Sequence, residues 1–349
     1  MTDISQYAQL PTVQAIYRHY EDNREEPHRP HLGGSQIGHP CDRYLWLLFR
    51  WADHARFDGR MIRLFDRGNL EEARLVRDLR NIGATVYEVD PETGRQFNFT
   101  AFGGHFGLSL DAVAHGLRES AKWHVVEMKT HNARSFADLK RKGVEKSKPQ
   151  HADQMQIGME LADIDRALYL AVNKDTDEIY GERLRRDQKR AKALLDRAER
   201  VIFSESPLDR VSDRPDWYQC KFCSMHSICH GDRVAEVNCR TCVHSTPERG
   251  GTWSCREHGR TLSVDEQRAG CKSHLMRPDL VPYAKAVDSG PGFVEYRARD
   301  GSTFWNHVDG ASAGECRYTS IEMRAAAGTL PLPPDTEALR QAFDARVEA

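Results

Sequence analysis

The chain has 349 residues, of which 39% are hydrophobic and 29% charged, a composition that suits a soluble globular protein and excludes a disordered one. Its 50 Lys and Arg residues are balanced by 52 Asp and Glu residues, so no overall positive charge indicates a nucleic-acid partner, although a local basic patch could still bind one. The length allows two domains, or one large domain with an appendage.

Nothing in the sequence indicates a membrane protein. The longest apolar run, RYLWLLFRW, is far too short for a membrane span and is interrupted by arginine. The N-terminal MTDISQYAQL lacks both a basic start and an apolar core, so we expect no signal peptide and a cytoplasmic location. In that compartment nine cysteines favour metal or redox chemistry over disulfides.

After an N-terminal helical segment, expected over residues 1–32, the first long helix is predicted at 60–82, and Gly83 follows its end. Glu72 falls on the apolar stripe of this helix and therefore needs a partner in the core, whereas Glu71 is expected to face solvent. The apolar residues of the stripe are Phe65, Leu75, Val76 and Leu79.

Strands and helices alternate over the next part of the chain. Strands are predicted at 84–90, 95–101, 105–116, 122–130, 166–174 and 177–184. Helices are predicted at 133–142, 150–163 and 187–203, with a basic loop after the first of them. This order predicts an α/β fold with a mixed sheet flanked by helices.

The stretch VVEMKT places Glu127 and Lys129 on the same face of a strand, because alternate residues of a strand share a face. Asp111 ends the preceding stretch GLSLD, and antiparallel pairing would set it beside Glu127. Two carboxylates would then hold a hard cation such as Mg²⁺ or Mn²⁺, and the lysine would orient or polarise a water. The alternative is a surface strand that carries these charges without a function.

A glutamine adds to this pattern. Gln154 shares a helical face with apolar neighbours, whereas Gln156 is expected to lie toward acidic ones. We interpret Glu72 and Gln154 as two further contributors to one site. The alternative is that each is a polar core residue with its hydrogen bonds satisfied.

The cysteines fall into two groups of four with one left over, which suggests two separate four-thiolate sites. The first group combines Cys41 with Cys220, Cys223 and Cys229. The second group comprises Cys239, Cys242, Cys255 and Cys271, and the remaining Cys316 is expected to be an ordinary small residue.

The stretch GSQIGHPCDRYLWLLF, which leads through a Ser-x-x-Gly loop into Cys41, completes a resemblance. Over residues 33–232 the chain resembles iron–sulfur members of the PD-(D/E)XK nuclease superfamily. It is similar to CRISPR-adaptation exonucleases, to the nuclease module of the AddAB helicase–nuclease and to phage-borne relatives. The resemblance implies a restriction-endonuclease-like core, with a mixed central sheet flanked by helices.

The same resemblance implies that the first cysteine group binds a 4Fe-4S cluster, which would clasp the front helix to the back of the core. A competing interpretation takes Cys239 as the fourth ligand of a zinc knuckle instead.

The resemblance also assigns roles to the carboxylate site. Asp111 and Glu127 match the metal-binding carboxylates, Lys129 the catalytic lysine, and Gln154 a glutamine that helps to position the substrate. Glu72 and Met128 complete the expected Mg²⁺ or Mn²⁺ set. Gly158 is a departure, because many relatives have a tyrosine at that position.

Residues 236–275 are expected to form a small structural zinc module with the second cysteine group as ligands, one of which a histidine could replace. The candidate substitutes are His244, His258 and His274. The alternative is a set of free cysteines. Residues 276–349 are expected to hold a β-hairpin at 292–309 and a last helix capped by Asp335.

The function implied is that of a metal-dependent DNA exonuclease, acting in phage or bacterial recombination, repair or replication beside a helicase or a single-strand annealing protein. An endonuclease and a non-catalytic iron–sulfur and zinc protein that binds DNA or a partner are the alternatives. Sequence-independent contacts to the DNA backbone are expected from the basic stretch 140–148. Its candidates are Lys140, Arg141, Lys142, Lys146 and Lys148.

Overall fold

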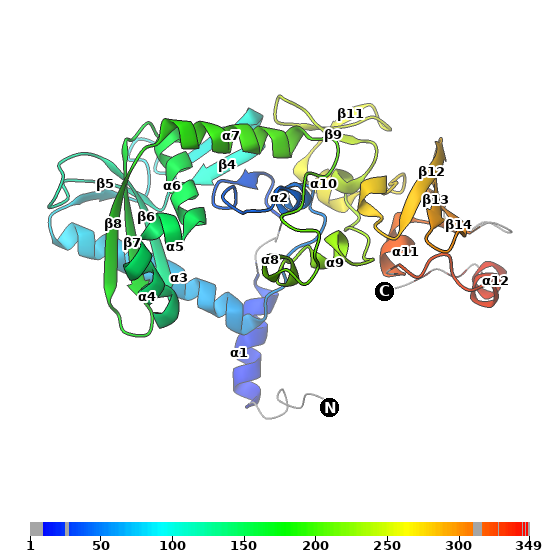
Figure 1. Ribbon diagram of the computed structural model, residues 1–349, viewed down its shortest axis with the longest axis horizontal. Helices are drawn as coiled ribbons and strands as arrows, with labels where there is room; N and C mark the ends of the chain where they lie inside the picture. The colour runs from blue at the N-terminus through cyan, green and yellow to red at the C-terminus, as the bar shows by residue number, and fades with distance from the viewer. Residues whose placement is uncertain are drawn as a thin grey trace.

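The computed structural model describes residues 10–24, 28–309, 316–326, 328–343, 345 and 347. In the view of Figure 1 the molecule is elongated, with a five-stranded sheet and its helices at one end and a four-stranded sheet at the other. The cysteine-rich turns and short helices lie between these two ends. Within the described residues, no helix has both the length and the apolar character needed to cross a membrane.

The five-stranded sheet has the order β2-β5-β6-β7-β8. It is mixed, as predicted, because β6 and β7 are parallel while the other neighbours are antiparallel. Its strands are β2 (Thr85–Tyr87), β5 (Ala112–His115), β6 (His124–His131), β7 (Arg166–Asn173) and β8 (Ile179–Arg185). The parallel pair lies near the middle of the sheet and is largely buried, which is usual for parallel strands.

Helices cover both faces of this sheet. On one face, α3 (Gly59–Asn81) buries Leu75, Val76 and Leu79 in a cluster with Val126 and Met128 of β6. On the other face, α4 (Ala133–Lys142) and α6 (Pro149–Leu161) contact β6 and β7. Alternate residues of β6 thus face opposite layers, which directs Glu127 and Lys129 away from the α3 cluster.

The prediction for α3 is correct in position and wrong for the burial of Phe65. Asp58 caps the helix by accepting a hydrogen bond of 2.8 Å from the backbone N–H of Met61. Phe65, expected on the buried stripe, is 48% exposed and packs edge-on against Phe57 instead. The reason is that the first half of α3 extends past the sheet toward α1 (Pro11–Asp22), as Figure 1 shows.

The stretch 105–116 forms two strands where one was predicted. β4 (Phe106–Ser109) belongs to a separate three-stranded sheet, and β5 belongs to the larger sheet. In the small sheet β4 pairs with β1 (Leu32–Gly33) in parallel and with β3 (Asn98–Ala101) antiparallel. Asp111 lies between β4 and β5, at the point where the chain passes from one sheet to the other.

The predicted basic loop is mostly helical. Lys140, Arg141 and Lys142 form the last turn of α4, and α5 (Val144–Ser147) follows directly. Gly143 separates the two helices with a φ of 74°, a backbone conformation that glycine adopts without strain. The helix predicted at 187–203 is α7 (Gln188–Phe203).

Short elements build the cysteine-rich middle of the molecule. They are α2 (Asp42–Phe49), α8 (Tyr218–Lys221), α9 (His226–Cys229) and α10 (Val264–Ala269), the antiparallel strands β9 (Ser245–Pro247), β10 (Trp253–Cys255) and β11 (Arg260–Leu262), and the 3₁₀ turns η2 (Phe102–Gly104), η3 (Cys239–Thr241) and η4 (Pro278–Leu280).

The C-terminal sheet contains the predicted hairpin, β13 (Phe293–Ala298) and β14 (Thr303–His307). It is widened by β12 (Ala284–Gly290) and β15 (Arg317–Tyr318), and α11 (Ser320–Ala325) and α12 (Pro334–Ala342) follow. Asp335 does not cap α12 as predicted, because the helix already begins at Pro334 and Asp335 lies in its first turn.

Candidate active site

The pairing of β5 with β6 brings two carboxylates together. Ala112 lies opposite Val126 in this antiparallel pair. Asp111, the residue before Ala112, therefore lies opposite Glu127, the residue after Val126. The backbone N–H of Met128 donates a hydrogen bond of 2.9 Å to Asp111 Oδ2. The position predicted for Asp111 is therefore the one that the structure has.

Lys129 lies between the two carboxylates. Its Nζ is 2.5 Å from Glu127 Oε1 and 3.5 Å from Asp111 Oδ2, and it donates a hydrogen bond of 2.9 Å to the carbonyl oxygen of Met128. Glu127 is 3% exposed, whereas Asp111 is 17% and Lys129 27% exposed. The group is thus buried on the Glu127 side and open on the side of the other two.

Gln154 reaches the same group from α6, as predicted. Its Nε2 donates a hydrogen bond of 2.9 Å to Glu127 Oε2, and the side chain is buried. Gln156, expected to lie toward acidic neighbours, is buried as well. It donates a hydrogen bond to the carbonyl oxygen of Arg185 and accepts one from the backbone N–H of Asp187, just ahead of α7.

Glu72, on α3, lies close enough to the site that the charges of Asp111 and Lys129 act on it. Burial raises the pKa of its carboxyl to about 7, and the nearby charge of Asp111 contributes in the same direction. Glu71, expected in solvent, is 15% exposed at its side chain and lies 3.5 Å from Arg74. The interpretation of Glu72 as a contributor to the carboxylate group agrees with this placement.

Burial and charge shift the pKa values of the ionisable groups in the site. Burial raises the pKa of Glu127 to about 7, although Lys129 opposes this effect. Burial alone would lower the pKa of Lys129, but the carboxylates of Glu127 and Asp111 outweigh it and hold that pKa above its usual range. The carboxylates of Glu127, Asp111 and Glu72 all act on the one ammonium group of Lys129, so negative charge exceeds positive charge at the site.

Sequence reasoning missed two histidines beside this group. Tyr169 OH lies 2.9 Å from His131 Nε2 and 2.9 Å from His151 Nδ1. Since a hydroxyl has one proton, it donates to one imidazole and accepts from the other. Burial lowers the pKa of His131 to about 4 and that of His151 to about 3, so both rings are neutral at pH 7. Their spacing was a usable signal, because His131 is two residues after Lys129 and His151 three before Gln154.

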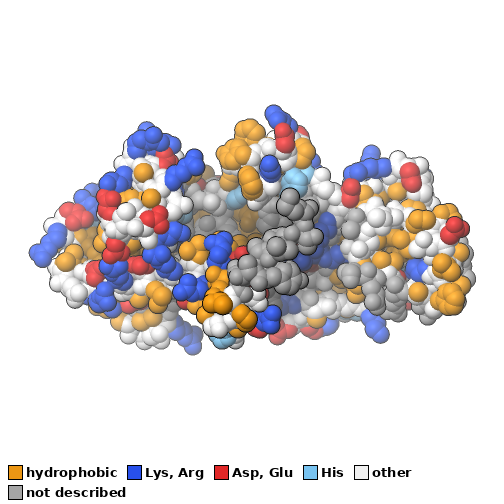
Figure 2. Space-filling view, turned by 90° about the horizontal axis from the view of Figure 1, so that it is seen from below, with side chains coloured by type: hydrophobic (Ala, Val, Ile, Leu, Met, Phe, Trp, Pro, Cys, Tyr) orange, Lys and Arg blue, Asp and Glu red, His pale blue; other side chains and the backbone are white. Residues whose placement is uncertain are grey.

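The basic residues of 140–148 are partly neutralised. Lys140 forms an ion pair with Glu178, and both Arg141 and Lys142 pair with Asp138. Figure 2 accordingly shows blue and red side chains interspersed at the end of the molecule that carries the larger sheet. An open groove runs along α4, and its basic lining residues are Arg134, Arg141, Lys142 and Lys148.

The first cysteine group comes together as predicted. Cys41, Cys220, Cys223 and Cys229 line one small cavity between the start of α2 and the helices α8 and α9. Backbone N–H groups point at two of the sulfurs: Tyr44 N lies 3.4 Å from Cys41 Sγ and Met225 N lies 3.4 Å from Cys223 Sγ. Such N–H···S hydrogen bonds suit thiolates that hold an iron–sulfur cluster.

The second cysteine group lines a different cavity, of about 100 Å³, together with His244, His258 and His274. Cys239 belongs to this group, which speaks against its use as a fourth ligand by the first. His258 Nε2 lies 3.6 Å from Cys271 Sγ. His274 Nε2 lies 3.0 Å from the carbonyl oxygen of Asn238, so this nitrogen already serves as a donor within the fold.

No protein-family model matches the chain, and no curated protein is similar to it in sequence. Among solved structures, the chain is similar to SSO0001, with a TM-score of 0.39 and 16% identity over 64% of this chain and 98% of the other. It is also similar to an alkaline exonuclease (LHK-Exo) from Laribacter hongkongensis, with a TM-score of 0.37 and 18% identity over 50% and 87% of the two chains. LHK-Exo in complex with dAMP gives a TM-score of 0.37 and 16% identity over 54% and 90%. None of these matches assigns the chain to a family.

Proposed function

We propose that the chain is a metal-dependent deoxyribonuclease that hydrolyses phosphodiester bonds, with exonuclease action on linear DNA in phage or bacterial recombination, repair or replication. The observation that carries this proposal is the β5–β6 pairing, which sets Asp111 opposite Glu127 with Lys129 Nζ within reach of both carboxylates. An ordinary surface strand would leave such charges apart or in solvent. Here one carboxylate is almost fully buried.

A divalent cation such as Mg²⁺ or Mn²⁺ suits this group, because its ligands are carboxylate oxygens and the site carries more negative than positive charge. Asp111 and Glu127 would hold the ion, with Glu72 and the carbonyl oxygen of Met128 beside them. When bound, the cation would neutralise the scissile phosphate and make water a stronger nucleophile.

The chain's own residues then have distinct tasks. Lys129 is placed to orient the attacking water and to stabilise the charge that builds on the phosphate. Gln154 fixes the orientation of Glu127 through their hydrogen bond, and so acts as a positioning residue. The basic groove along α4 would hold the DNA backbone without reading the bases.

The cysteine groups have structural tasks in this proposal. A 4Fe-4S cluster on Cys41, Cys220, Cys223 and Cys229 would tie α2 to the segment after α7, and the shared cavity and the N–H···S contacts support it. A zinc ion on Cys239, Cys242, Cys255 and Cys271 would stabilise a module too small to have a large core of its own.

The test is digestion of end-labelled linear DNA and closed-circular DNA, single- and double-stranded, with Mg²⁺ or Mn²⁺. Wild-type protein, prepared without oxygen, is compared with Lys129→Ala and with Lys192→Ala, which removes an exposed lysine of α7 that pairs with Asp196. We expect metal-dependent loss of linear DNA with the wild type and Lys192→Ala. Lys129→Ala should lower the rate by about 100-fold or more.

Two other outcomes decide against parts of the proposal. Cutting of closed circles would show an endonuclease. If a folded wild-type protein leaves every substrate intact under all metal conditions, the protein binds DNA or a partner on a nuclease-like site and is not the enzyme proposed.

A further inference from the structure

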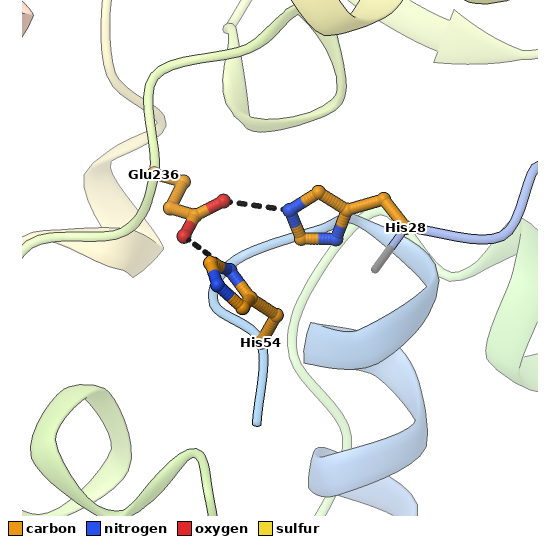
Figure 3. Close-up of side chains that lie close together, drawn as sticks. All are labelled: His28, His54 and Glu236. Atoms are coloured by element: carbon orange, nitrogen blue, oxygen red, sulfur yellow. Dashed lines mark hydrogen bonds and ion pairs between the residues drawn. The ribbon is translucent and has the colours of Figure 1, made fainter. Parts of the chain in front are cut away.

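A second group of metal-binding side chains lies outside the carboxylate site: His28, His54 and Glu236 (Figure 3). His28 Nε2 is 2.7 Å from Glu236 Oε2, and His54 Nδ1 is 2.8 Å from Glu236 Oε1. The possible ligand atoms of these three described residues all lie within 4.8 Å of one another. Two imidazole nitrogens and a carboxylate oxygen are typical ligands of Zn²⁺ and related ions.

The three side chains are positioned by contacts outside the group. The His28 ring stacks on Trp51, with centroids 5.5 Å apart, and the indole N–H of Trp51 donates to the carbonyl oxygen of Arg29. The backbone N–H of Glu236 donates a hydrogen bond of 2.7 Å to the carbonyl oxygen of Ala52, two residues before His54. The ligands are therefore oriented before any ion arrives, which lowers the entropic cost of binding.

The group is reachable from solvent. The side chains of His28, His54 and Glu236 are 12%, 23% and 19% exposed, and both histidines line a cavity of about 280 Å³. An ion held by these three ligands would keep a further coordination position for water or for an anion.

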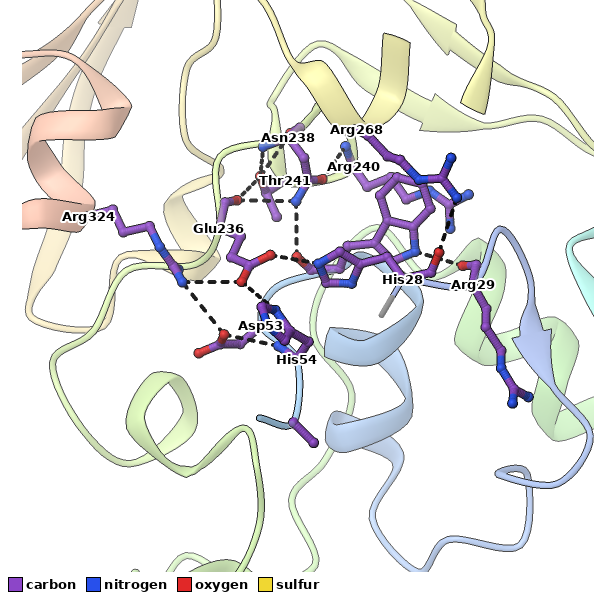
Figure 4. A network of polar contacts seen from close by, with 12 residues as sticks. His28, Arg29, Asp53, His54, Glu236, Asn238, Arg240, Thr241, Arg268 and Arg324 are labelled. Carbon is purple, nitrogen blue, oxygen red and sulfur yellow. Dashed lines mark hydrogen bonds and ion pairs between the residues drawn. The ribbon is translucent and has the colours of Figure 1, made fainter. Parts of the chain in front are cut away.

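A neighbouring arginine competes for the carboxylate. Arg324 Nη2 lies 3.4 Å from Glu236 Oε1, but it also lies 3.6 Å from Asp53 Oδ1, as the network in Figure 4 shows. Asp53 is buried and would keep the arginine paired when a cation takes Glu236. The arginine would therefore weaken the binding of a cation here without preventing it.

We propose that His28, His54 and Glu236 bind one divalent transition-metal ion, for which Zn²⁺ is the best chemical fit. The ion would link the segment ahead of β1 and the segment after α2 to the connector that leads into the cysteine module. This site is independent of the proposed nuclease activity and of both cysteine groups.

The test is the zinc content of the full-length protein, purified with added zinc and measured by elemental analysis. His28→Gln and His54→Gln are compared with the wild type and with His19→Gln, which changes a histidine of α1 that contacts Asn23. We expect one zinc ion per chain to be lost in each of the first two variants and in their double variant, and none in His19→Gln. Wild-type zinc content in folded His28→Gln and His54→Gln would overturn the proposal.

Two further measurements cover the case in which these variants fold poorly. Arg324→Gln should bind zinc several-fold more tightly in competition with a chromogenic chelator, an effect that mere destabilisation would not produce. Zinc X-ray absorption of the wild type should show nitrogen and oxygen neighbours beside the sulfur neighbours of the cysteine site. A spectrum with sulfur neighbours alone would contradict the proposal.

Discussion

At the scale of single residues, the carboxylate site combines burial with an excess of negative charge. Glu127 is almost fully buried, yet it receives hydrogen-bond or charge contacts from both Lys129 and Gln154. Glu72 and Glu127 nevertheless keep pKa values raised to about 7, because one ammonium group does not compensate the burial of several carboxylates.

This charge balance predicts a pH-dependent affinity for Mg²⁺ or Mn²⁺. Below a pH of about 7, protons occupy Glu72 and Glu127 and compete with the cation, so affinity should rise as pH increases through that value. Titration calorimetry with Mn²⁺ at a series of pH values measures it, with Glu127→Gln as the control that should lose most of the affinity. An affinity that is constant across this pH range would contradict the placement of these carboxylates at the metal site.

At the scale of elements, the sequence predicted the strands and helices that have a regular apolar pattern. It failed where pairing between distant segments determines which sheet a strand joins. The alternation in VVEMKT predicted β6 and the shared face of Glu127 and Lys129. The stretch 105–116 also alternates, but alternation does not reveal that β4 and β5 pair in different sheets.

Other parts of the site lay beyond local patterns. Gln154 and Gln156 were assigned to opposite environments, yet both are buried because α7 begins against α6 and covers Gln156. His28, His54 and Glu236 were not identified at all, because they come from three segments that only the folded chain brings together.

The 4Fe-4S cluster proposed above makes a direct prediction for the elements α2, α8 and α9. If the cluster is bound as proposed, Cys41→Ser should remove its visible absorbance and lower the unfolding temperature, because α2 would lose its link through the cluster to α8 and α9. Absorbance and thermal unfolding of anaerobic protein measure both effects. Cys316→Ser, outside both cysteine groups, is the control and should change neither the absorbance nor the unfolding temperature. Equal behaviour of the two variants would contradict the proposed cluster.

At the scale of the whole molecule, one arginine joins the cysteine module to the core. Arg240 is 1% exposed and donates hydrogen bonds to the carbonyl oxygens of Phe49 and Pro30 and to the side chain of Gln267. Its guanidinium lies 3.7 Å from the ring centroid of Trp51. Burial lowers the pKa of Arg240.

Arg240→Leu should therefore destabilise the protein by about 3 kcal/mol or more, since it leaves two buried acceptors and one partly buried acceptor without a donor, at about 1–3 kcal/mol for each buried group. Urea unfolding followed by tryptophan fluorescence measures the loss. Arg249→Leu is the matched control, because Arg249 forms an exposed pair with Glu199 and should cost less than about 1 kcal/mol. Similar losses in the two variants would show that the module and the core are not joined at this point.

The break between β4 and β5 has a consequence of its own. Asp111 follows a strand of the small sheet and precedes a strand of the large one, so its position depends on the alignment of the two sheets. The small sheet also contains β1, which begins four residues after His28. We therefore expect that a substitution in β1 or β3 that shifts the small sheet against the large one changes the distance between Asp111 and Glu127.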